Sequence, residues 1–358
     1  MHMSLGNWAV LMDNFLFTLY IPLAAVFWSS VLHLVNGKWR YEVRFLMASA
    51  RALFPLGFVL LLIILASGRH CFPWMGGESF GIGEPLNGWH NHIFFDMREI
   101  VLYLVVWGYC NYFVKLQRKE FPNADPADRR RFRNIALLAP FVYCIYGTIV
   151  GWDFEMTQIP RWWSPIYGPM HFESMMRAFL AFFIVSLFVL RQRDSLKRRI
   201  NDYVFNYLAQ IMLALTIIWT YAFFVQYLVM WYGDLPDEIV RYDNMMHGPN
   251  WFLFWAFFFM NSFIPFLMLI FSAMRQSPAL MLIPSASILM GTFMEHYMWI
   301  ISPQADSYYH TPFLSSWVDV VITLVIFSAG CLLWDRQMKK DGLYYEGEDE
   351  EKAQEATA

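Results

Sequence analysis

Long apolar stretches alternate with short polar segments along nearly the whole chain. Each stretch is long enough for a helix to cross about 30 Å of hydrocarbon, and the period-2 alternation that a membrane barrel needs is absent. A helix satisfies its backbone hydrogen bonds internally, so this pattern favours a helical bundle. It predicts an all-α, polytopic membrane bundle of about nine transmembrane helices, approximately over residues 8–35, 46–66, 93–114, 134–155, 170–190, 204–231, 250–272, 279–301 and 315–334.

The composition indicates the same class. Apolar residues make up 58% of the 358 residues, aromatic residues 19% and charged residues 15%, and the mean hydropathy is positive. These values are typical of an integral membrane protein. We therefore expect one transmembrane domain over residues 1–340, followed by a disordered acidic cytoplasmic tail over 341–358.

Basic residues are distributed unevenly among the predicted loops. Loops 36–45, 115–133, 191–203 and 273–278, with the tail after residue 334, contain 20 of the 26 Lys and Arg residues, whereas the opposite loops contain three. The positive-inside rule therefore predicts that the N-terminus is outside and the C-terminus is cytoplasmic. An odd number of helices requires the same arrangement.

Several kinds of catalytic centre are disfavoured because their motifs are missing. The four cysteines are scattered without a C-x-x-C pair or a C-x-x-C-H motif, so we expect no iron–sulfur cluster and no covalent haem. Phosphate-binding glycine loops and a nucleophile elbow are also missing, which argues against nucleotide-driven transport and hydrolase chemistry. We predict no metal ligands and no binding to nucleic acid.

Ionisable residues nevertheless interrupt the predicted helices, mostly toward the predicted outer face. One face of the third helix carries four polar residues at i, i+4, i+7 and i+11, namely His92, Asp96, Glu99 and Tyr103. A charge in the bilayer core costs about 3 kcal/mol, so it is usually functional or paired. We interpret this face as a row of proton carriers, with a structural ion-pair network as the alternative. Arg98 should pair with a carboxylate of another helix.

A second polar group lies where the fourth helix ends, where the fifth begins and in the outer half of the eighth. Its members are Asp153, Glu155, His171, Glu173, Arg177, Glu295 and His296. Glu173 and Arg177 are spaced i, i+4 and can pair. His171 and His296 are a possible pair of haem ligands, but their carboxylate neighbours suit proton transfer better. Asp13 and Asp319 are expected at similar depth.

Prolines and tryptophans shape the segment 156–169 between the fourth and fifth helices. With Pro160 and Pro165 it should form a rigid loop at the outer interface. Trp162 and Trp163 in this loop can belong to an interfacial aromatic belt or form a wall for a flat quinone ring. Within the helices, kinks that free backbone carbonyls are predicted at Pro22, Pro55, Pro140, Pro265 and Pro284.

The run WDFEMTQIPRWWSPIYG over 152–168 resembles the loop after a core helix in the quinone-binding subunit 2, or F subunit, of alternative complex III, a family similar to the NrfD/PsrC membrane subunits. The matching positions are Asp153, Met156, Pro160, Trp162, Ser164, Ile166, Tyr167 and Gly168. A second stretch includes Trp219, Tyr221, Gln226, Tyr227 and the sequence WYGDLPDE over 231–238. Weaker similarity over 264–266 and 299–303 extends the resemblance across most of 90–305.

The resemblance implies a multi-pass subunit of a quinol:cytochrome c, or other acceptor, oxidoreductase in the respiratory chain of a bacterial inner membrane. The implied fold is two four-helix bundles plus an extra helix. Quinol would be the substrate, and the chain itself would bind no haem or iron–sulfur cluster. The implied partners are a sister NrfD-like membrane subunit, iron–sulfur and haem c subunits on the periplasmic side, and membrane lipids.

Two hypotheses follow for the polar residues. In the first, quinol docks in an outer pocket, electrons leave to a neighbouring subunit, and the proton-accepting candidates are Asp96, Glu99, His171, Glu173, Glu295 and His296. The candidates for binding the quinone are then His92, Tyr103, Asp153, Trp162, Trp163 and Arg177. In the second, the quinol site lies in the sister subunit, and the same acids conduct protons or lock the helix bundle.

Overall fold

Helices form all the regular structure that can be described in this chain. The computed structural model describes residues 5–76, 88–119, 125–159, 162–193, 196, 200–301 and 316–344. Over these residues there is no β-strand, only an isolated antiparallel bridge between Leu196 and Tyr344. The helices are α1 (Leu5–Leu34), α2 (Arg40–Ser49), η1 (Ala50–Leu53), α3 (Phe54–Ala66), α4 (Gly68–Cys71), α5 (Pro73–Gly76), η3 (Gly88–His90), α6 (His92–Lys119), α7 (Pro126–Phe154), η4 (Met156–Gln158), α8 (Tyr167–Arg191), α9 (Asp202–Tyr232), α10 (Pro236–His247), α11 (Trp251–Asn261), α12 (Phe263–Ile270), α13 (Ser272–Arg275), α14 (Leu282–Ile301) and α15 (Trp317–Lys340).

Seven segments of the described chain are long and apolar enough to cross a membrane. They are Gly6–Leu34, Arg40–Ala66, Pro126–Gln158, Tyr167–Arg191, Asp202–Tyr232, Trp251–Ile270 and Trp317–Lys340. Two further helices, α6 and α14, coincide with the predicted spans 93–114 and 279–301, but ionisable residues interrupt both and they are not among the seven. The prediction of a multi-pass helical bundle is therefore confirmed, whereas nine crossings stay a prediction.

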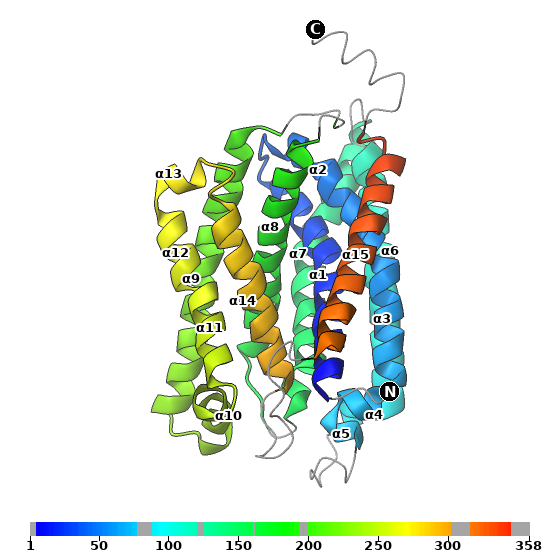
Figure 1. Ribbon diagram of the computed structural model, residues 1–358. Coiled ribbons are helices and arrows are strands. Elements are labelled where there is room, and N and C mark those ends of the chain that lie inside the picture. Colours follow the sequence, from blue (N-terminus) through cyan, green and yellow to red (C-terminus); the bar gives the residue numbers. More distant parts are fainter. Residues whose placement is uncertain are drawn as a thin grey trace.

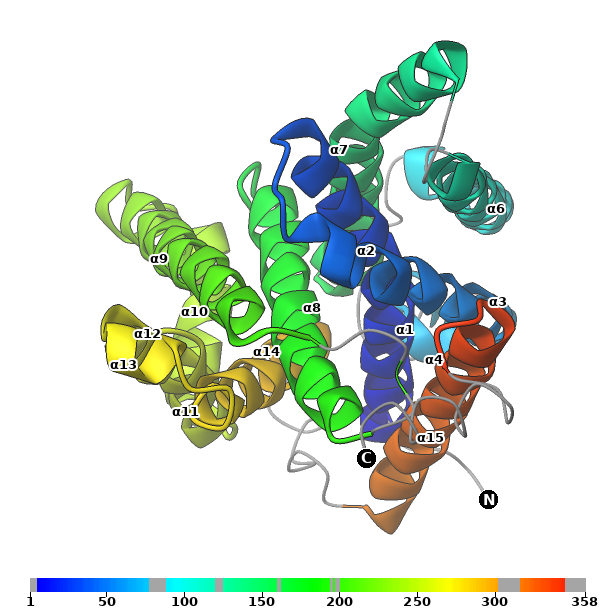
Figure 2. The ribbon, with the colours of Figure 1, turned by 90° about the horizontal axis from the view of Figure 1, so that it is seen from above.

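The long helix α1 occupies the centre of the molecule. It packs against α3, α7, α8, α14 and α15, and most of its residues are buried. On one side of α1, α6 bridges α3 and α7. On the other side α8 packs against α9 and α14, α12 against α9, and α11 against α14. Figure 2 shows α15 at the edge of the bundle, beside α1.

The two ends of the bundle carry the elements that the charge pattern predicts for them. The N-terminus, α4, α5 and α10 lie at one end, and α13 with the C-terminal end of α15 lies at the other (Figure 1). We refer to these as the outer and inner ends, following the predicted orientation. At the inner end Asp341 forms ion pairs with Arg51 (3.0 Å) and Arg118, and Tyr344 is buried.

The predicted start of the tail was therefore wrong. Residues 341–344 belong to the folded body because Asp341 is anchored by two arginines. The rest of the predicted tail, 345–358, lies outside the described residues. The acidic composition that suggested a tail from 341 onward carried no information about this pairing.

Two prolines free carbonyl groups that other helices then use, as predicted. Proline has no N–H, so the carbonyl four residues earlier loses its helical partner. Pro265 in this way frees the carbonyl of Asn261, where the chain breaks between α11 and α12 and Arg177 donates to the freed oxygen at 2.6 Å. Pro140 frees the carbonyl of Ala136, which accepts from the Ser30 hydroxyl at 2.5 Å.

Candidate functional site

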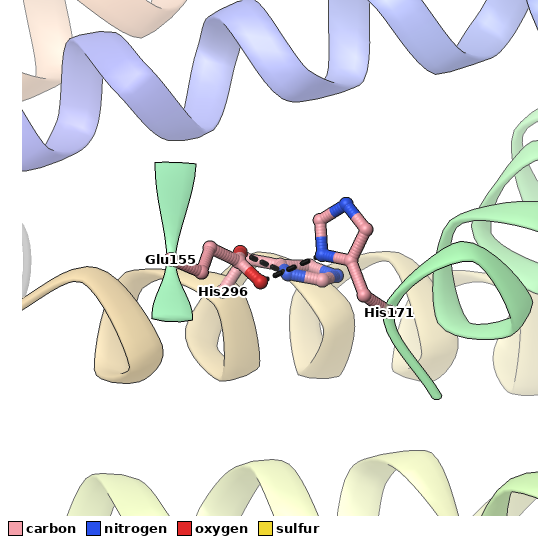
Figure 3. A group of neighbouring side chains, drawn as sticks. All are labelled: Glu155, His171 and His296. Atoms are coloured by element: carbon pink, nitrogen blue, oxygen red, sulfur yellow. Dashed lines mark hydrogen bonds and ion pairs between the residues drawn. The ribbon is translucent and has the colours of Figure 1, made fainter. Parts of the chain in front are cut away.

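Glu155 is the centre of a fully buried hydrogen-bonded group at the outer end of the bundle. It follows α7 directly, and its carboxylate accepts from the Tyr167 hydroxyl. Nδ1 of His171 on α8 lies 2.6 Å from one carboxylate oxygen, and Nδ1 of His296 on α14 lies 2.5 Å from the other (Figure 3). Two helices, α8 with Tyr167 and His171 and α14 with His296, thus supply protonatable groups to one buried carboxylate. We call Tyr20, Glu155, Tyr167, His171 and His296 the Glu155 cluster.

Tyr20 on α1 extends this cluster toward the middle of the bundle. Its hydroxyl lies 2.9 Å from Nε2 of His171 and 3.1 Å from the carbonyl oxygen of Gly147. The hydroxyl has one hydrogen. When it donates to Gly147, His171 Nε2 donates to Tyr20, and the imidazole is cationic when Nδ1 at the same time donates to Glu155. When it donates to His171, the imidazole is neutral.

Two glycines allow α8 and α1 to approach α7 closely enough to form the Glu155 cluster. A Cβ atom at Gly151 would lie 2.9 Å from the His171 ring. A Cβ atom at Gly147 would lie 2.7 Å from Cβ of Phe172 and 3.3 Å from the Tyr20 hydroxyl. Small residues spaced i, i+4 are a common device for close helix packing in membranes. The sequence G-x-x-x-G at 147–151 therefore positions His171.

Arg241 fixes the outer side of the cluster from α10, outside the seven apolar spans. Its Nη2 donates to the carbonyl oxygens of Glu155 (3.2 Å) and Trp299 (2.6 Å). The guanidinium lies 4.4 Å from the ring centre of Trp162 and 4.6 Å from that of Trp299. Burial lowers the pKa of Arg241 to about 10, so the side chain remains charged at neutral pH.

A second buried carboxylate, Glu295, lies beside His296 in the sequence and has different partners. Its oxygens accept from Ser174 Oγ at 2.8 Å, Trp219 Nε1 at 3.0 Å and Asn261 Nδ2 at 3.0 Å. The guanidinium of Arg177 lies 4.8 Å from the Trp219 ring centre and donates to the Asn261 carbonyl. We call Ser174, Arg177, Trp219, Asn261 and Glu295 the Glu295 cluster. None of the donors to its carboxylate titrates near neutral pH.

A third group, the Asp153 cluster, contains His90, Arg98, Glu99 and Asp153. Arg98 Nη2 lies 2.6 Å from Asp153, and Arg98 Nε lies 3.5 Å from Glu99. His90 Nε2 lies 3.3 Å from Asp153, and the guanidinium of Arg98 lies 4.3 Å from the Trp89 ring centre. The prediction that Arg98 pairs with a carboxylate of another helix is confirmed.

The geometry at Glu155 favours hydrogen bonds over a bound ion. Ligand atoms of Glu155, His171 and His296 lie within 4.8 Å of one another, which is close enough for a metal ion to be considered. Two ligands of one tetrahedral zinc ion stand about 3.3 Å apart for bonds of about 2.0–2.1 Å. The observed 2.5 and 2.6 Å are hydrogen-bond distances. The two imidazole rings lie only 4.9 Å apart, which leaves no room for a haem between them.

The other polar residues predicted for the third helix and the fifth are dispersed. His92 is exposed and pairs with the partly buried Asp96 at 3.3 Å. Tyr103 instead donates to the Phe54 carbonyl at 2.7 Å, at the contact with α3. Glu173 is buried, but neither of its carboxylate oxygens has a hydrogen-bond partner in the described chain. The predicted pair between Glu173 and Arg177 is therefore not formed as a direct ion pair.

The two tryptophans of the outer loop have separate environments. Trp162 is buried and donates from Nε1 to the Glu238 carbonyl at 3.0 Å, whereas Trp163 is 63% exposed. They do not form a continuous flat wall. Pro160, which was predicted to stiffen this loop, lies outside the described residues.

Several members of these clusters were not among the predicted site residues. They are Tyr20, Tyr167, Ser174, Trp219, Arg241 and Asn261. One usable signal was present for Tyr20, because it lies seven residues after Asp13 and therefore on the same face of α1. Asp13 is fully buried, has no hydrogen-bond partner in the described chain and interacts electrostatically with Glu155 and Glu295.

Comparison with known proteins adds no family assignment to this geometry. The chain matches no protein-family model, and no curated protein matches it. The chemistry of the three clusters therefore carries the interpretation of function.

Proposed function

We propose that this chain is an integral membrane subunit of a quinol-oxidising electron-transfer complex, and that the Glu155 cluster transfers protons within it. The resemblance to subunit 2 of alternative complex III supports the class of complex. The buried polar geometry supports the role in proton transfer. In this proposal the quinol is oxidised in a sister membrane subunit, and electrons pass to iron–sulfur and haem c subunits on the periplasmic side.

One observation carries the proposal. Glu155 is completely buried, yet its carboxylate contacts two imidazoles and a phenol, each of which can take up or release a proton. The Tyr20 hydroxyl can switch its hydrogen between Gly147 and His171. A proton carried by one imidazole can therefore pass between His171 and His296 through the Glu155 carboxylate along short hydrogen bonds, and the Tyr20 hydroxyl can give its proton to His171 as it takes up another at the same oxygen.

The charge balance of the interior supports the same role. In the described chain, the Glu155 and Glu295 clusters and their buried neighbours contain four carboxyl groups, on Asp13, Glu155, Glu173 and Glu295, but two guanidinium groups, on Arg177 and Arg241. A buried net charge is very unfavourable. Two protons held on these carboxyl groups or on the two imidazoles would neutralise the group. Such a cluster can store protons and release them.

The arrangement in the membrane forms part of the proposal. We propose nine crossings that include α6 and α14, with the N-terminus in the periplasm and the C-terminus in the cytoplasm of a bacterium. In this arrangement α1, α2–α3, α6 and α7 form one four-helix bundle, α8, α9, α11–α12 and α14 form the other, and α15 is the extra helix. The helix contacts described above support this division.

The decisive variant is Glu155→Gln, which keeps the shape of the side chain and removes the charge. The complex that contains this chain is reconstituted in vesicles, and the number of protons moved per electron is measured together with the rate of quinol oxidation. We expect the proton ratio to fall while quinol still binds.

The matched control is Glu42→Gln, because Glu42 lies at the inner end and, in the described part of the chain, accepts hydrogen bonds from surface groups such as Asn201. This control should leave the proton ratio unchanged. An unchanged ratio in Glu155→Gln, with normal assembly of the complex, would remove the Glu155 cluster from the mechanism.

A cavity favours a second candidate function, direct quinol binding by this chain. The cavity has a volume of about 370 Å³, lies between α1, α14 and α15, and is lined almost wholly by apolar side chains. Its few polar groups belong to Asn14, Thr18 and Thr323. Asn14 follows Asp13 in the sequence, and Asp13 interacts electrostatically with Glu155 and Glu295. If quinol binds here, Asn14→Leu should weaken quinone binding, whereas Glu155→Gln should not.

A further inference from the structure

The inner ends of α6 and α7 carry a dense group of exposed basic side chains. Its members, which we call the basic rim, are Lys115, Lys119, Arg129, Arg130, Arg131 and Arg133. Arg118 lies in the same region and pairs with Asp341, which also pairs with Arg51. The acidic residues at the start of α7 are Asp125 and Asp128, so the rim keeps a clear excess of positive charge.

Near its start α7 packs through Phe132 against Phe113 of α6 and His33 of α1, whereas its arginines are exposed. Figure 2 looks onto the inner end and shows this part of α7 projecting from the bundle. Among the arginines of the rim, and within the described part of the chain, Arg131 contacts α6, with its guanidinium 5.6 Å from the ring centre of Tyr112. The other arginines of the rim extend from a free helix surface and are available to an anionic partner.

An apolar stripe continues directly from the rim along the outward face of α7. Leu137, Phe141 and Ile145 are 48%, 66% and 62% exposed and follow Arg130 at i+7, i+11 and i+15. These positions lie on one side of the helix. From Arg133 to Ile145 the helix rises about 18 Å, which is close to the thickness of one leaflet including part of its headgroup region.

We propose that the basic rim and this stripe bind an anionic phospholipid of the inner leaflet. The phosphate of the headgroup would contact Arg130 and Arg133, Arg131 would add positive charge from the side of α6, and an acyl chain would lie along Leu137, Phe141 and Ile145. Basic clusters next to a transmembrane helix on the cytoplasmic side attract anionic lipids. The proposal is independent of proton transfer, because it uses none of the residues of the three buried clusters.

The test uses the full chain, with any subunits that copurify with it. Native mass spectrometry measures binding of phosphatidylglycerol and of phosphatidylcholine to the detergent-solubilised protein. The test variant combines Arg130→Gln, Arg131→Gln and Arg133→Gln. We expect it to bind phosphatidylglycerol about tenfold more weakly than the wild type, because each basic residue near the surface contributes to binding.

Two controls separate this site from total charge and from folding. The first combines Lys38→Gln, Arg336→Gln and Lys340→Gln, which removes the same charge from exposed positions elsewhere at the inner end. The second combines Arg130→Lys, Arg131→Lys and Arg133→Lys, which keeps the charge at the rim. Both should retain tight binding of phosphatidylglycerol.

Three results would overturn the proposal. The first is equal binding of phosphatidylglycerol by the glutamine variant and the wild type. The second is equal binding of phosphatidylcholine and phosphatidylglycerol by the wild type. The third is a partner subunit crosslinked to Phe141 in the assembled complex, because a protein would then cover the stripe instead of a lipid.

Discussion

At the scale of single residues, Glu155 and Glu295 are alike in burial and different in chemistry. Each carboxylate accepts from three side chains. The donors to Glu155 are a phenol and two imidazoles, which can exchange protons, whereas those to Glu295 are a serine, a tryptophan and an asparagine, which cannot near neutral pH. We therefore assign proton transfer to Glu155 and structural anchoring of α8, α9, α11 and α14 to Glu295.

This assignment predicts the behaviour of Glu295→Gln. The amide would present an NH₂ group where the carboxylate accepts hydrogen bonds. The Glu295 cluster would also lose its carboxylate, which compensates the charge of Arg177. Removing one partner of a buried charged group costs about 3–5 kcal/mol. We expect a lower midpoint of thermal unfolding for the purified protein in detergent, measured beside Glu42→Gln. A midpoint equal to that of the wild type would contradict an anchoring role.

Tyr20→Phe separates proton transfer from stability. The ring and its packing against His171 are kept, and only the hydroxyl is lost. The stability cost should be about 1 kcal/mol for one lost hydrogen bond, and the proton ratio of the complex should fall.

Tyr103→Phe is the matched control, because it removes a buried hydroxyl that donates to the Phe54 carbonyl and not to a residue of the Glu155 cluster. It should cost similar stability and leave the proton ratio unchanged. Equal proton ratios in the two variants would remove Tyr20 from the path.

At the scale of helices, close packing of α7 on α8 decides whether the Glu155 cluster can form. Gly151→Ala would place a methyl group 2.9 Å from the His171 ring, so the ring must move away from Glu155. We expect lower stability and a reduced proton ratio. Gly108→Ala in α6 is the control, because no heavy atom lies within 4 Å of the added Cβ. The midpoint of thermal unfolding and the proton ratio are measured for both variants. A Gly151→Ala variant with the midpoint and proton ratio of the wild type would contradict this prediction.

Much of the helical architecture could be predicted from the apolar pattern, because a bilayer demands long continuous helices. The short helices α4, α5 and α10 were not predicted, since they lie outside the apolar runs. The freed carbonyls of Ala136 and Asn261 were predicted from the missing N–H of Pro140 and Pro265, but their partners Ser30 and Arg177 were not. Such partners are set by helix packing over long sequence distances, which periodicity does not encode.

The candidate site was predictable in part for the same reason. His171 and His296 attracted attention because ionisable groups are rare in apolar helices. Tyr20 did not, and Trp219 was named only for the family resemblance, because aromatic residues are common in this chain. Their polar atoms matter only once they meet His171 and Glu295. The residues of the polar face of the third helix share a side of α6 but contact different partners, since its neighbours change along its length.

At the scale of the whole molecule, the distribution of charge and the fold agree on two distinct ends. The segments rich in Lys and Arg lie at the end that carries the C-terminal end of α15, and the N-terminus lies at the other (Figure 1). This arrangement requires an odd number of crossings, which seven and nine both satisfy. Orientation and the crossing by α6 can therefore be tested together.

Single cysteines introduced at Trp163, Lys119 and Lys340 provide this test. All three positions are exposed. A membrane-impermeant maleimide added to the periplasmic side should label Trp163→Cys alone, and the other two should react only after the membrane is opened. Labelling of Lys119→Cys from the periplasm would mean that α6 does not cross, and labelling of Lys340→Cys would reverse the orientation. Cys71 should contribute little background at pH 7, because burial raises the pKa of its thiol to about 12 and the reactive thiolate is scarce.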